Sequence, residues 1–200
     1  TSLGLIDALV QRLEDLAYQL PTPVQEQTIP SVLAGRDVMV AAQTGTGKTA
    51  SFALPLLQRL TVEGASVASN CVRCLVLVPT RELAEQVHES FRTYGARLGV
   101  RTHVAYGGVS INPQMMTLRK GLDVLVATPG RLLDLHRHNA VKFHQLQTLV
   151  LDEADRMLDM GFSDDLMKII SFLPEKRQNL LFSATFAPKM KTLAQKLLQN

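Results

Sequence analysis

Short runs of apolar and β-branched residues alternate along this chain with longer stretches in which apolar residues recur at helical spacing. The short runs are nearly continuously apolar, which is typical of strands that are covered on both faces in a parallel sheet. The pattern predicts strands at Asp37–Ala41, Val72–Val78, Arg101–Tyr106, Asp123–Ala127, Thr148–Leu151 and Asn179–Ser183. It predicts helices at Leu5–Tyr18, Val24–Leu33, Lys48–Leu60, Glu82–Leu98, Gly130–His138, Asp164–Leu173 and Pro188–Leu198.

The repeated alternation of strand and helix indicates right-handed βαβ units. The predicted fold class is therefore α/β, with a mostly parallel, doubly wound sheet flanked by helices. The most polar connection, residues 61–70, lacks apolar periodicity and is predicted to be a mobile surface loop. Ligands of such open sheets bind beyond the carboxyl ends of the strands, so candidate functional residues are expected there.

The segment AQTGTGKT, from Ala42 to Thr49, lies between a predicted strand and a predicted helix. A glycine-rich loop in this position wraps backbone N–H groups around an anion, and the helix N-terminus adds a favourable dipole. Lys48 is expected to reach the β- and γ-phosphates, and the Thr49 hydroxyl to complete a magnesium shell. The pattern usually begins with Gly rather than Ala. The remaining loop residues predicted to surround the phosphates are Thr44, Gly45, Thr46 and Gly47.

The predicted strand Thr148–Leu151 leads directly into Asp152 and Glu153. An Asp at the tip of a buried strand beside a phosphate-binding loop can hold magnesium, usually through water. A neighbouring Glu can orient and deprotonate an attacking water. An isolated Asp-Glu pair is more often the start of a solvated helix, but the upstream Lys48-Thr49 favours catalysis. The implied reaction is in-line attack of water on a γ-phosphate.

Composition allows one sizeable globular domain, with 200 residues of which 46% are hydrophobic and 20% charged. The net charge of +3 permits a polyanionic partner without demanding one. No apolar run approaches the roughly 18 residues that span a bilayer, so no membrane partner is expected. Cys71 and Cys74 form a C-x-x-C pair, but no second pair completes a zinc site. On a strand they point to opposite faces, which predicts reduced core cysteines. The cytoplasm is the expected compartment, because the two cysteines are predicted to be reduced.

Taken in chain order, these strings resemble the motifs of the DEAD-box ATP-dependent RNA helicases. Asp152–Asp155 spells the family's name, Ala42–Thr49 resembles motif I, and Ala17–Gln25 resembles the Q motif that is specific to the family. The matches to motifs Ia, Ib and III are Pro79–Leu83, Thr128–Arg131 and Ser183–Thr185. The resemblance covers essentially the whole chain, and Arg156–Phe162 looks most like the bacterial RhlE-like branch.

The resemblance implies a single RecA-like P-loop NTPase domain with ATP and Mg2+ as cofactors. Residues 1–35 would form a helical Q-motif region packed on the core, and residues 36–200 the first RecA-like domain. Gln25 would read the adenine edge with its amide, and Tyr18 would stack on the ring. The usual Gly before this aromatic residue is Ala17 here, a change expected to be harmless.

The resemblance also assigns catalytic roles to Lys48, to Asp152 as the magnesium-positioning carboxylate and to Glu153 as the base. It implies RNA-facing residues that contact the sugar-phosphate backbone with little sequence preference. These are Thr80, Arg81, Gly107, Gly108, Thr128, Gly130 and Arg131. For the two arginines, an ordinary surface salt bridge is the simpler alternative. The residues implied to link the ATP site to the RNA side are Asp155, Ser183 and Thr185.

The family builds its active site between two RecA-like domains, and the motifs of the second domain are absent from this chain. Because an arginine finger from that domain is worth roughly 10³–10⁵ in rate, the isolated domain is expected to bind nucleotide and hydrolyse it weakly. Two alternatives remain: a DNA-directed helicase or translocase, and an ATP-gated RNA clamp with little unwinding. The Q motif and the DEAD string argue against the first. Intact Lys48, Thr49 and Glu153 favour a working ATPase over the second.

Overall fold

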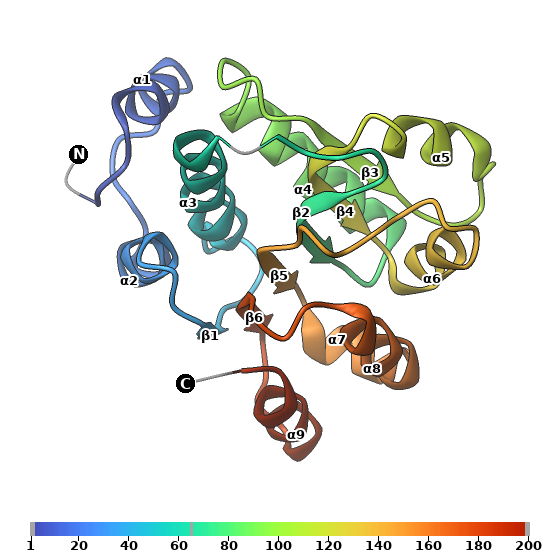
Figure 1. Cartoon of the computed structure of the whole chain (residues 1–200). Helices are drawn as coiled ribbons and strands as arrows, with labels where there is room; N and C mark the ends of the chain where they lie inside the picture. Colours follow the sequence, from blue (N-terminus) through green and yellow to red (C-terminus); the bar gives the residue numbers. More distant parts are fainter. Residues whose placement is uncertain (1–2, 65, 199–200) are drawn as a thin grey trace.

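The structure is a computed structural model that describes residues 3–64 and 66–198. Within these residues, one sheet of six parallel strands has the order β1-β6-β5-β2-β4-β3, with helices on both faces (Figure 1). This arrangement confirms the predicted α/β fold class. The strands are β1 (Val38–Ala41), β2 (Val72–Leu77), β3 (Thr102–Ala105), β4 (Leu122–Ala127), β5 (Thr148–Leu151) and β6 (Gln178–Ser183). All predicted strands are present, with ends that differ by at most one residue.

The predicted helices are also present, with ends shifted by a few residues. They are α1 (Asp7–Asp15), α2 (Pro23–Leu33), α3 (Lys48–Glu63), α4 (Arg81–Tyr94), α6 (Pro129–Arg137), α8 (Ser163–Phe172) and α9 (Pro188–Leu197). Two helices were not predicted, α5 (Asn112–Leu118) and α7 (Ala154–Asp159). Both are too short to display helical periodicity in the sequence. No described helix combines the length and the apolar character needed to cross a bilayer.

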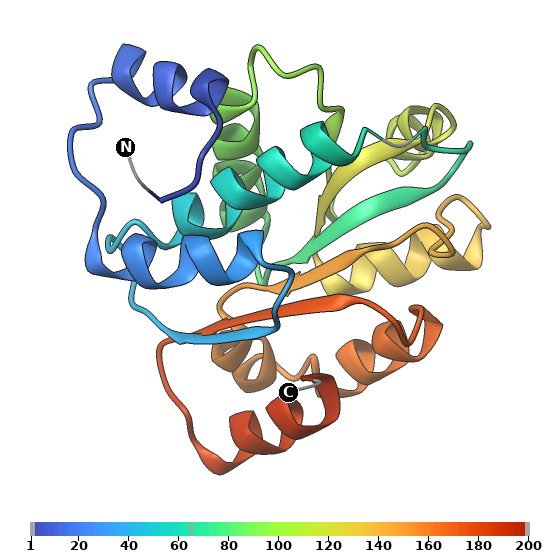
Figure 2. The same cartoon turned by 60° about the vertical axis from the view of Figure 1, so that its left-hand side comes forward.

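The sheet has an apolar core on each face. In β2, Leu75 and Leu77 enter one core, whereas Cys74 and Val76 enter the other. Helices α6, α8 and α9 cover the first core, and α1 to α4 cover the second (Figure 2). Burial on both faces explains the nearly continuous apolar strands. Cys71 and Cys74 are both buried and free, as predicted.

The connection after α3 differs from the prediction of a mobile loop over residues 61–70. Residues 61–63 belong to α3, because the helix continues to Glu63. Farther on, the backbone N–H of Ala68 donates to Gln145 Oε1 at 2.8 Å, and Asn70 Nδ2 donates to the carbonyl of Ala140 at 2.8 Å. These contacts anchor the segment to the connection before β5. Residue 65 lies outside the described residues.

Helix α1 ends in a turn at Ala17, where the Q motif begins. The backbone N–H of Tyr18 donates to the carbonyl of Leu13 at 2.9 Å, and that of Ala17 donates to Glu14 at 2.9 Å. This pair of bonds is a Schellman motif, in which the residue after the helix takes a left-handed conformation. Ala17 has φ 62°, a region where a Cβ atom is disfavoured. The expectation that Ala17 is a harmless replacement for Gly is therefore wrong for stability.

Replacing Ala17 with Gly is expected to stabilise the domain by about 0.5–1 kcal/mol, the relief of a left-handed Cβ less the added freedom of the unfolded chain. Thermal and denaturant unfolding measure the change. The matched control is Ala8→Gly, at an exposed position inside α1. That change is expected to destabilise by about 0.5–1 kcal/mol. Equal effects of the two substitutions would contradict strain at Ala17.

Candidate active site

The phosphate-binding loop connects the carboxyl end of β1 to the first residue of α3. Gly45 and Gly47 have φ values of 86° and 78°, both in the left-handed region. The Thr46 hydroxyl donates to the carbonyl of Gln43 at 2.7 Å and closes the loop. In the part of the chain that the structure describes, no side chain caps the N-terminus of α3, so its first backbone N–H groups are available to an anion. The loop thus has the conformation that the sequence predicted for phosphate binding.

The Q-motif glutamine lies against this loop. Gln25 Oε1 accepts from the backbone N–H of Thr22 at 3.0 Å, and Gln25 Nε2 donates to the carbonyl of Gly47 at 3.2 Å. The first bond belongs to a capping box at the start of α2. An amide has two N–H groups and two acceptor lone pairs, so one donor and one acceptor of Gln25 are unused by these bonds. These bonds therefore fix the orientation of the Gln25 amide, and they leave one donor and one acceptor that could pair with a base edge.

Replacing Gly47 with Ala is expected to separate the Q motif from the phosphate loop. A Cβ at Gly47 would lie 2.5 Å from Gln25 Nε2, in addition to the strain of the positive φ. Gly45→Ala is the matched control, since Gly45 also has a positive φ but a Cβ there would meet nothing within 4 Å. We expect both variants to lose about 1–2 kcal/mol from backbone strain, and Gly47→Ala to lose more. Unfolding by denaturant measures the difference, and equal losses would contradict the proposed contact.

Lys48 and Asp152 form a buried ion pair at the centre of the site. Lys48 Nζ lies 2.8 Å from Asp152 Oδ1, and the two side chains are 8% and 0% exposed. Burial raises the pKa of Asp152, and the Lys48 charge acts in the opposite direction. The Lys48 ammonium group is therefore held beside the phosphate loop by the carboxylate of Asp152, the residue that follows β5.

The oxygen groups at this position fit a magnesium ion. The carboxylate of Asp152 is fully buried, and Lys48 Nζ lies against one of its two oxygens. The Thr49 hydroxyl adds an oxygen in the first turn of α3. Magnesium prefers oxygen groups and keeps much of its shell as water and substrate phosphate. One carboxylate and one hydroxyl are therefore a sufficient protein contribution.

Glu153 follows Asp152 in an unusual backbone conformation. Its φ and ψ are 53° and 48°, and it precedes the first residue of α7. A left-handed residue other than Gly is strained, and such strain concentrates at functional sites. Glu153 Oε2 lies 3.6 Å from Arg156 Nη1 and has no hydrogen-bond partner among the described residues. The carboxylate thus combines a fixed position with unused acceptor capacity, as a general base requires.

Two elements that carry the predicted linking residues meet beside this site. The Thr185 hydroxyl, beyond the end of β6, donates to Asp155 Oδ2 of α7 at 3.2 Å. The Ser183 hydroxyl does not extend this bond to Asp155, because it donates to the carbonyl of Thr185 at 2.6 Å. Thr185 is therefore the direct contact, and Ser183 supports the turn that presents it.

The strand order divides the edge of the sheet into two halves. The residues predicted to hold phosphate and magnesium follow β1 and β5, which lie with β6 in one half, whereas the predicted RNA-facing residues follow β2, β4 and β3 in the other. A Cβ at Gly107 or Gly130 would meet nothing within 4 Å, so the fold itself does not require glycine there. Space for a closely approaching ligand is a reason for glycine at such positions.

Arg81 and Arg131 are held differently from each other. The Arg81 guanidinium stacks over the Tyr106 ring at 4.8 Å from its centroid. The Arg131 side chain is only 10% exposed, and it donates to Gln114 Oε1 and to the carbonyl of Val109, each at 3.0 Å. Its Nε also lies 3.9 Å from Asp134 Oδ2. Arg131 is thus held by α5, by the loop after β3 and by an ion pair within α6, and its contact with RNA stays a prediction. The sequence did not indicate Gln114, because α5 was not predicted.

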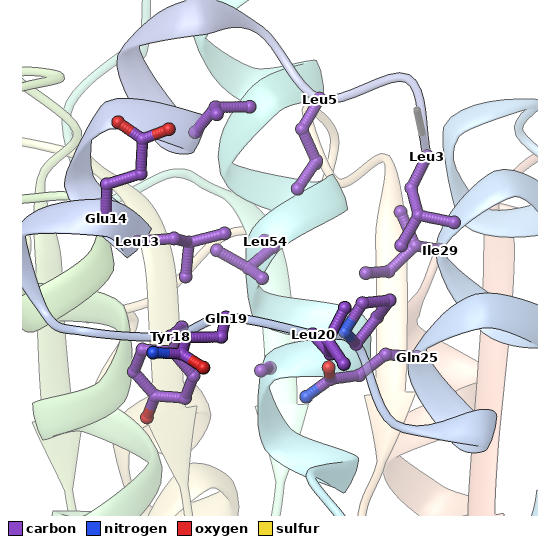
Figure 3. A pocket seen from close by; sticks show the side chains of 13 residues that line it. Leu3, Leu5, Leu13, Glu14, Tyr18, Gln19, Leu20, Gln25, Ile29 and Leu54 are labelled. Atoms are coloured by element: carbon purple, nitrogen blue, oxygen red, sulfur yellow. The ribbon is translucent and has the colours of Figure 1, made fainter. Parts of the chain in front are cut away.

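The two residues predicted to read adenine line a small cavity next to the Q-motif segment. Tyr18 and Gln25 contribute to a pocket of about 100 Å³ whose other walls are mainly apolar side chains of α1, α2 and α3 (Figure 3). Tyr18 is 51% exposed although it is a large aromatic residue. Exposed aromatic surface beside a phosphate-binding loop is suited to stacking on a base.

A six-stranded parallel sheet with this loop and a buried Lys-Asp pair defines a RecA-like P-loop domain. Residues 22–193 match the family model described as DEAD/DEAH box helicase. The chain therefore belongs to the DEAD/DEAH box helicase family.

Similar proteins from plants, bacteria and fungi share this domain. The chain is 44% identical to DEAD-box ATP-dependent RNA helicase 52A of Oryza sativa subsp. japonica, over 98% of the chain and 35% of that protein. It is 47% identical to DEAD-box ATP-dependent RNA helicase CshA of Streptococcus pneumoniae, over 96% of the chain and 36% of that protein. It is 48% identical to ATP-dependent rRNA helicase rrp3 of Emericella nidulans, over 99% and 42%. The chain thus spans well under half the length of these relatives. The RhlE-like subdivision stays a prediction.

Proposed function

We propose that this chain is the first RecA-like domain of an ATP-dependent RNA helicase, which binds Mg-ATP and the RNA backbone. The observation that carries the proposal is the contact of Gln25 with the carbonyl of Gly47, because it joins a base-reading amide to a phosphate-binding loop. The region of residues 1–35 supplies base recognition, and Leu9 and Ile29 pack it into the same core as α3. The region of residues 36–200 supplies the phosphate and RNA contacts.

The geometry of the site supports the following proposed roles for its residues. Lys48 would exchange its partner Asp152 for the phosphates, and Asp152 and Thr49 would hold magnesium. When bound, the ion neutralises charge on the phosphate oxygens. Glu153 takes a proton from the attacking water. A second RecA-like domain completes the site and raises the hydrolysis rate.

RNA is proposed to lie along the β2-β4-β3 half of the edge. Thr80 and Thr128 begin α4 and α6, where helix N-termini favour phosphate oxygens. Arg81 supplies positive charge, and Gly107, Gly108 and Gly130 leave space for the backbone. Arg131 supports this surface by holding the loop after β3.

Calorimetric titration of the chain with Mg-ADP and then Mg-GDP tests the nucleotide part of the proposal. Binding of ADP with clear preference over GDP is expected, since adenine presents an amino donor beside the N7 acceptor, whereas guanine presents two acceptors, N7 and O6, on the same edge. Equal binding would contradict base reading by Gln25, and binding of neither would contradict the nucleotide site.

Competition between single-stranded RNA and DNA of one sequence tests the partner. A preference for RNA is expected, whereas equal or stronger binding of DNA would favour a DNA-directed helicase or translocase. In a protein with both domains, strand separation distinguishes a helicase from an ATP-gated RNA clamp.

A further inference from the structure

Tyr18 is held by a second tyrosine that the proposed function has not used. The hydroxyl groups of Tyr18 and Tyr94 form a hydrogen bond at 3.2 Å. Their rings meet edge to face, with centroids 6.1 Å apart and an interplanar angle of 68°. Tyr18 is half exposed on a loop, whereas Tyr94 is 8% exposed at the end of α4. The buried tyrosine is therefore the fixed partner, and the exposed one is oriented by it.

The surroundings of Tyr94 make this contact specific. Burial, reinforced by the hydrogen bond with Tyr18, raises the pKa of Tyr94. The phenol therefore stays neutral across the physiological range and retains its O–H. Because a buried hydroxyl without a partner is costly, the bond to Tyr18 has a stabilising role for both residues.

Two further contacts attach α1, which precedes Tyr18, to the C-terminal end of α4. Arg12 Nε donates to the carbonyl of Thr93 at 2.7 Å, and Arg97 lies 2.9 Å from Asp15 Oδ2. Arg12 thereby satisfies a terminal carbonyl at the negative end of the helix dipole. Figure 2 shows α1 lying across the C-terminal end of α4. The left-handed turn at Ala17 then delivers Tyr18 onto Tyr94.

We infer that Tyr94 is a positioning residue for adenine recognition, whose hydroxyl holds the Tyr18 ring in the orientation that stacks on the base. The inference rests on the proposed role of Tyr18 in the nucleotide site. Tyr94 is the last residue of α4, whereas Thr80 and Arg81 of the proposed RNA surface lie at the start of this helix. The contribution of Tyr94 to binding is therefore expected to concern the base and not the phosphates of the nucleotide.

The test compares Tyr94→Phe with the unchanged chain in binding to Mg-ADP and to Mg-tripolyphosphate, which has no base. Loss of one neutral hydrogen bond predicts ADP binding that is weaker by about 3- to 10-fold. Tripolyphosphate binding is expected to stay unchanged. Equal weakening of both ligands, or no weakening of either, would overturn the inference.

Tyr18→Phe removes the other hydroxyl of the same bond from an exposed position and serves as the second variant. The two substitutions together are expected to weaken ADP no more than either alone, because they break one interaction. Additive losses would also overturn the inference. Tyr18→Ala separates the two proposals: if it leaves ADP binding unchanged, the stacking role of Tyr18 fails. If it weakens ADP while Tyr94→Phe does not, only the positioning role fails.

Discussion

Glu153→Gln is expected to lower RNA-stimulated ATP hydrolysis by roughly 10²–10⁴ in a protein that carries both RecA-like domains, while leaving nucleotide binding intact. The amide keeps the shape of the carboxylate but cannot accept a proton from the attacking water. Phosphate release and nucleotide titration on the same preparation measure the two properties. The strained backbone at Glu153 is preserved, because the substitution changes only the end of the side chain.

Asp159→Asn is the matched control, since it removes one carboxylate charge from an exposed position at the end of α7. It is expected to leave both hydrolysis and binding unchanged. Unaltered hydrolysis in Glu153→Gln would exclude Glu153 as the base. Loss of nucleotide binding in that variant would instead indicate that the carboxylate holds the ligand.

Lys48→Met is expected to abolish nucleotide binding and to lower the free energy of unfolding by about 3–5 kcal/mol. The apolar side chain keeps much of the volume but leaves the fully buried Asp152 without its counter-charge. Denaturant unfolding measures the stability, and calorimetry with Mg-ADP measures the binding. The double variant Lys48→Met/Asp152→Asn is expected to recover most of the stability and none of the binding.

The same pair predicts a pH dependence with a definite sign. Burial raises the pKa of Asp152 above 3.8, its ordinary value, so the folded chain binds this proton more tightly than the unfolded chain. The contribution of Asp152 to stability therefore falls as pH rises from about 3.8 through the raised pKa. Lys48→Met removes the charge that lowers this pKa and should extend the fall to higher pH. Asp152→Asn should abolish the fall, and identical pH profiles for the unchanged chain and Lys48→Met would contradict the pairing.

The strands, the phosphate loop and helix α5 show which features the sequence patterns could predict and which they could not. Continuous apolar runs predicted the strands because both sheet faces are buried, and the loop around Gly45 and Gly47 was predictable because its conformation depends on local glycines. Helix α5 was missed, and with it the anchor Gln114 for Arg131. A seven-residue helix has too few turns to show periodicity, so its existence depends on packing that the pattern does not contain.

The sequence by itself determined the six strands, their alternation with helices, the phosphate loop and the adjacent carboxylates Asp152 and Glu153. These are local properties, set by side-chain periodicity and by the backbone freedom of single residues. Only the tertiary structure decided that Lys48 pairs with Asp152, that Gln25 bonds Gly47, and that Tyr94 orients Tyr18. It also decided which strand ends share each half of the edge. Such contacts join residues far apart in the chain, and the order in which strands pair brings them together.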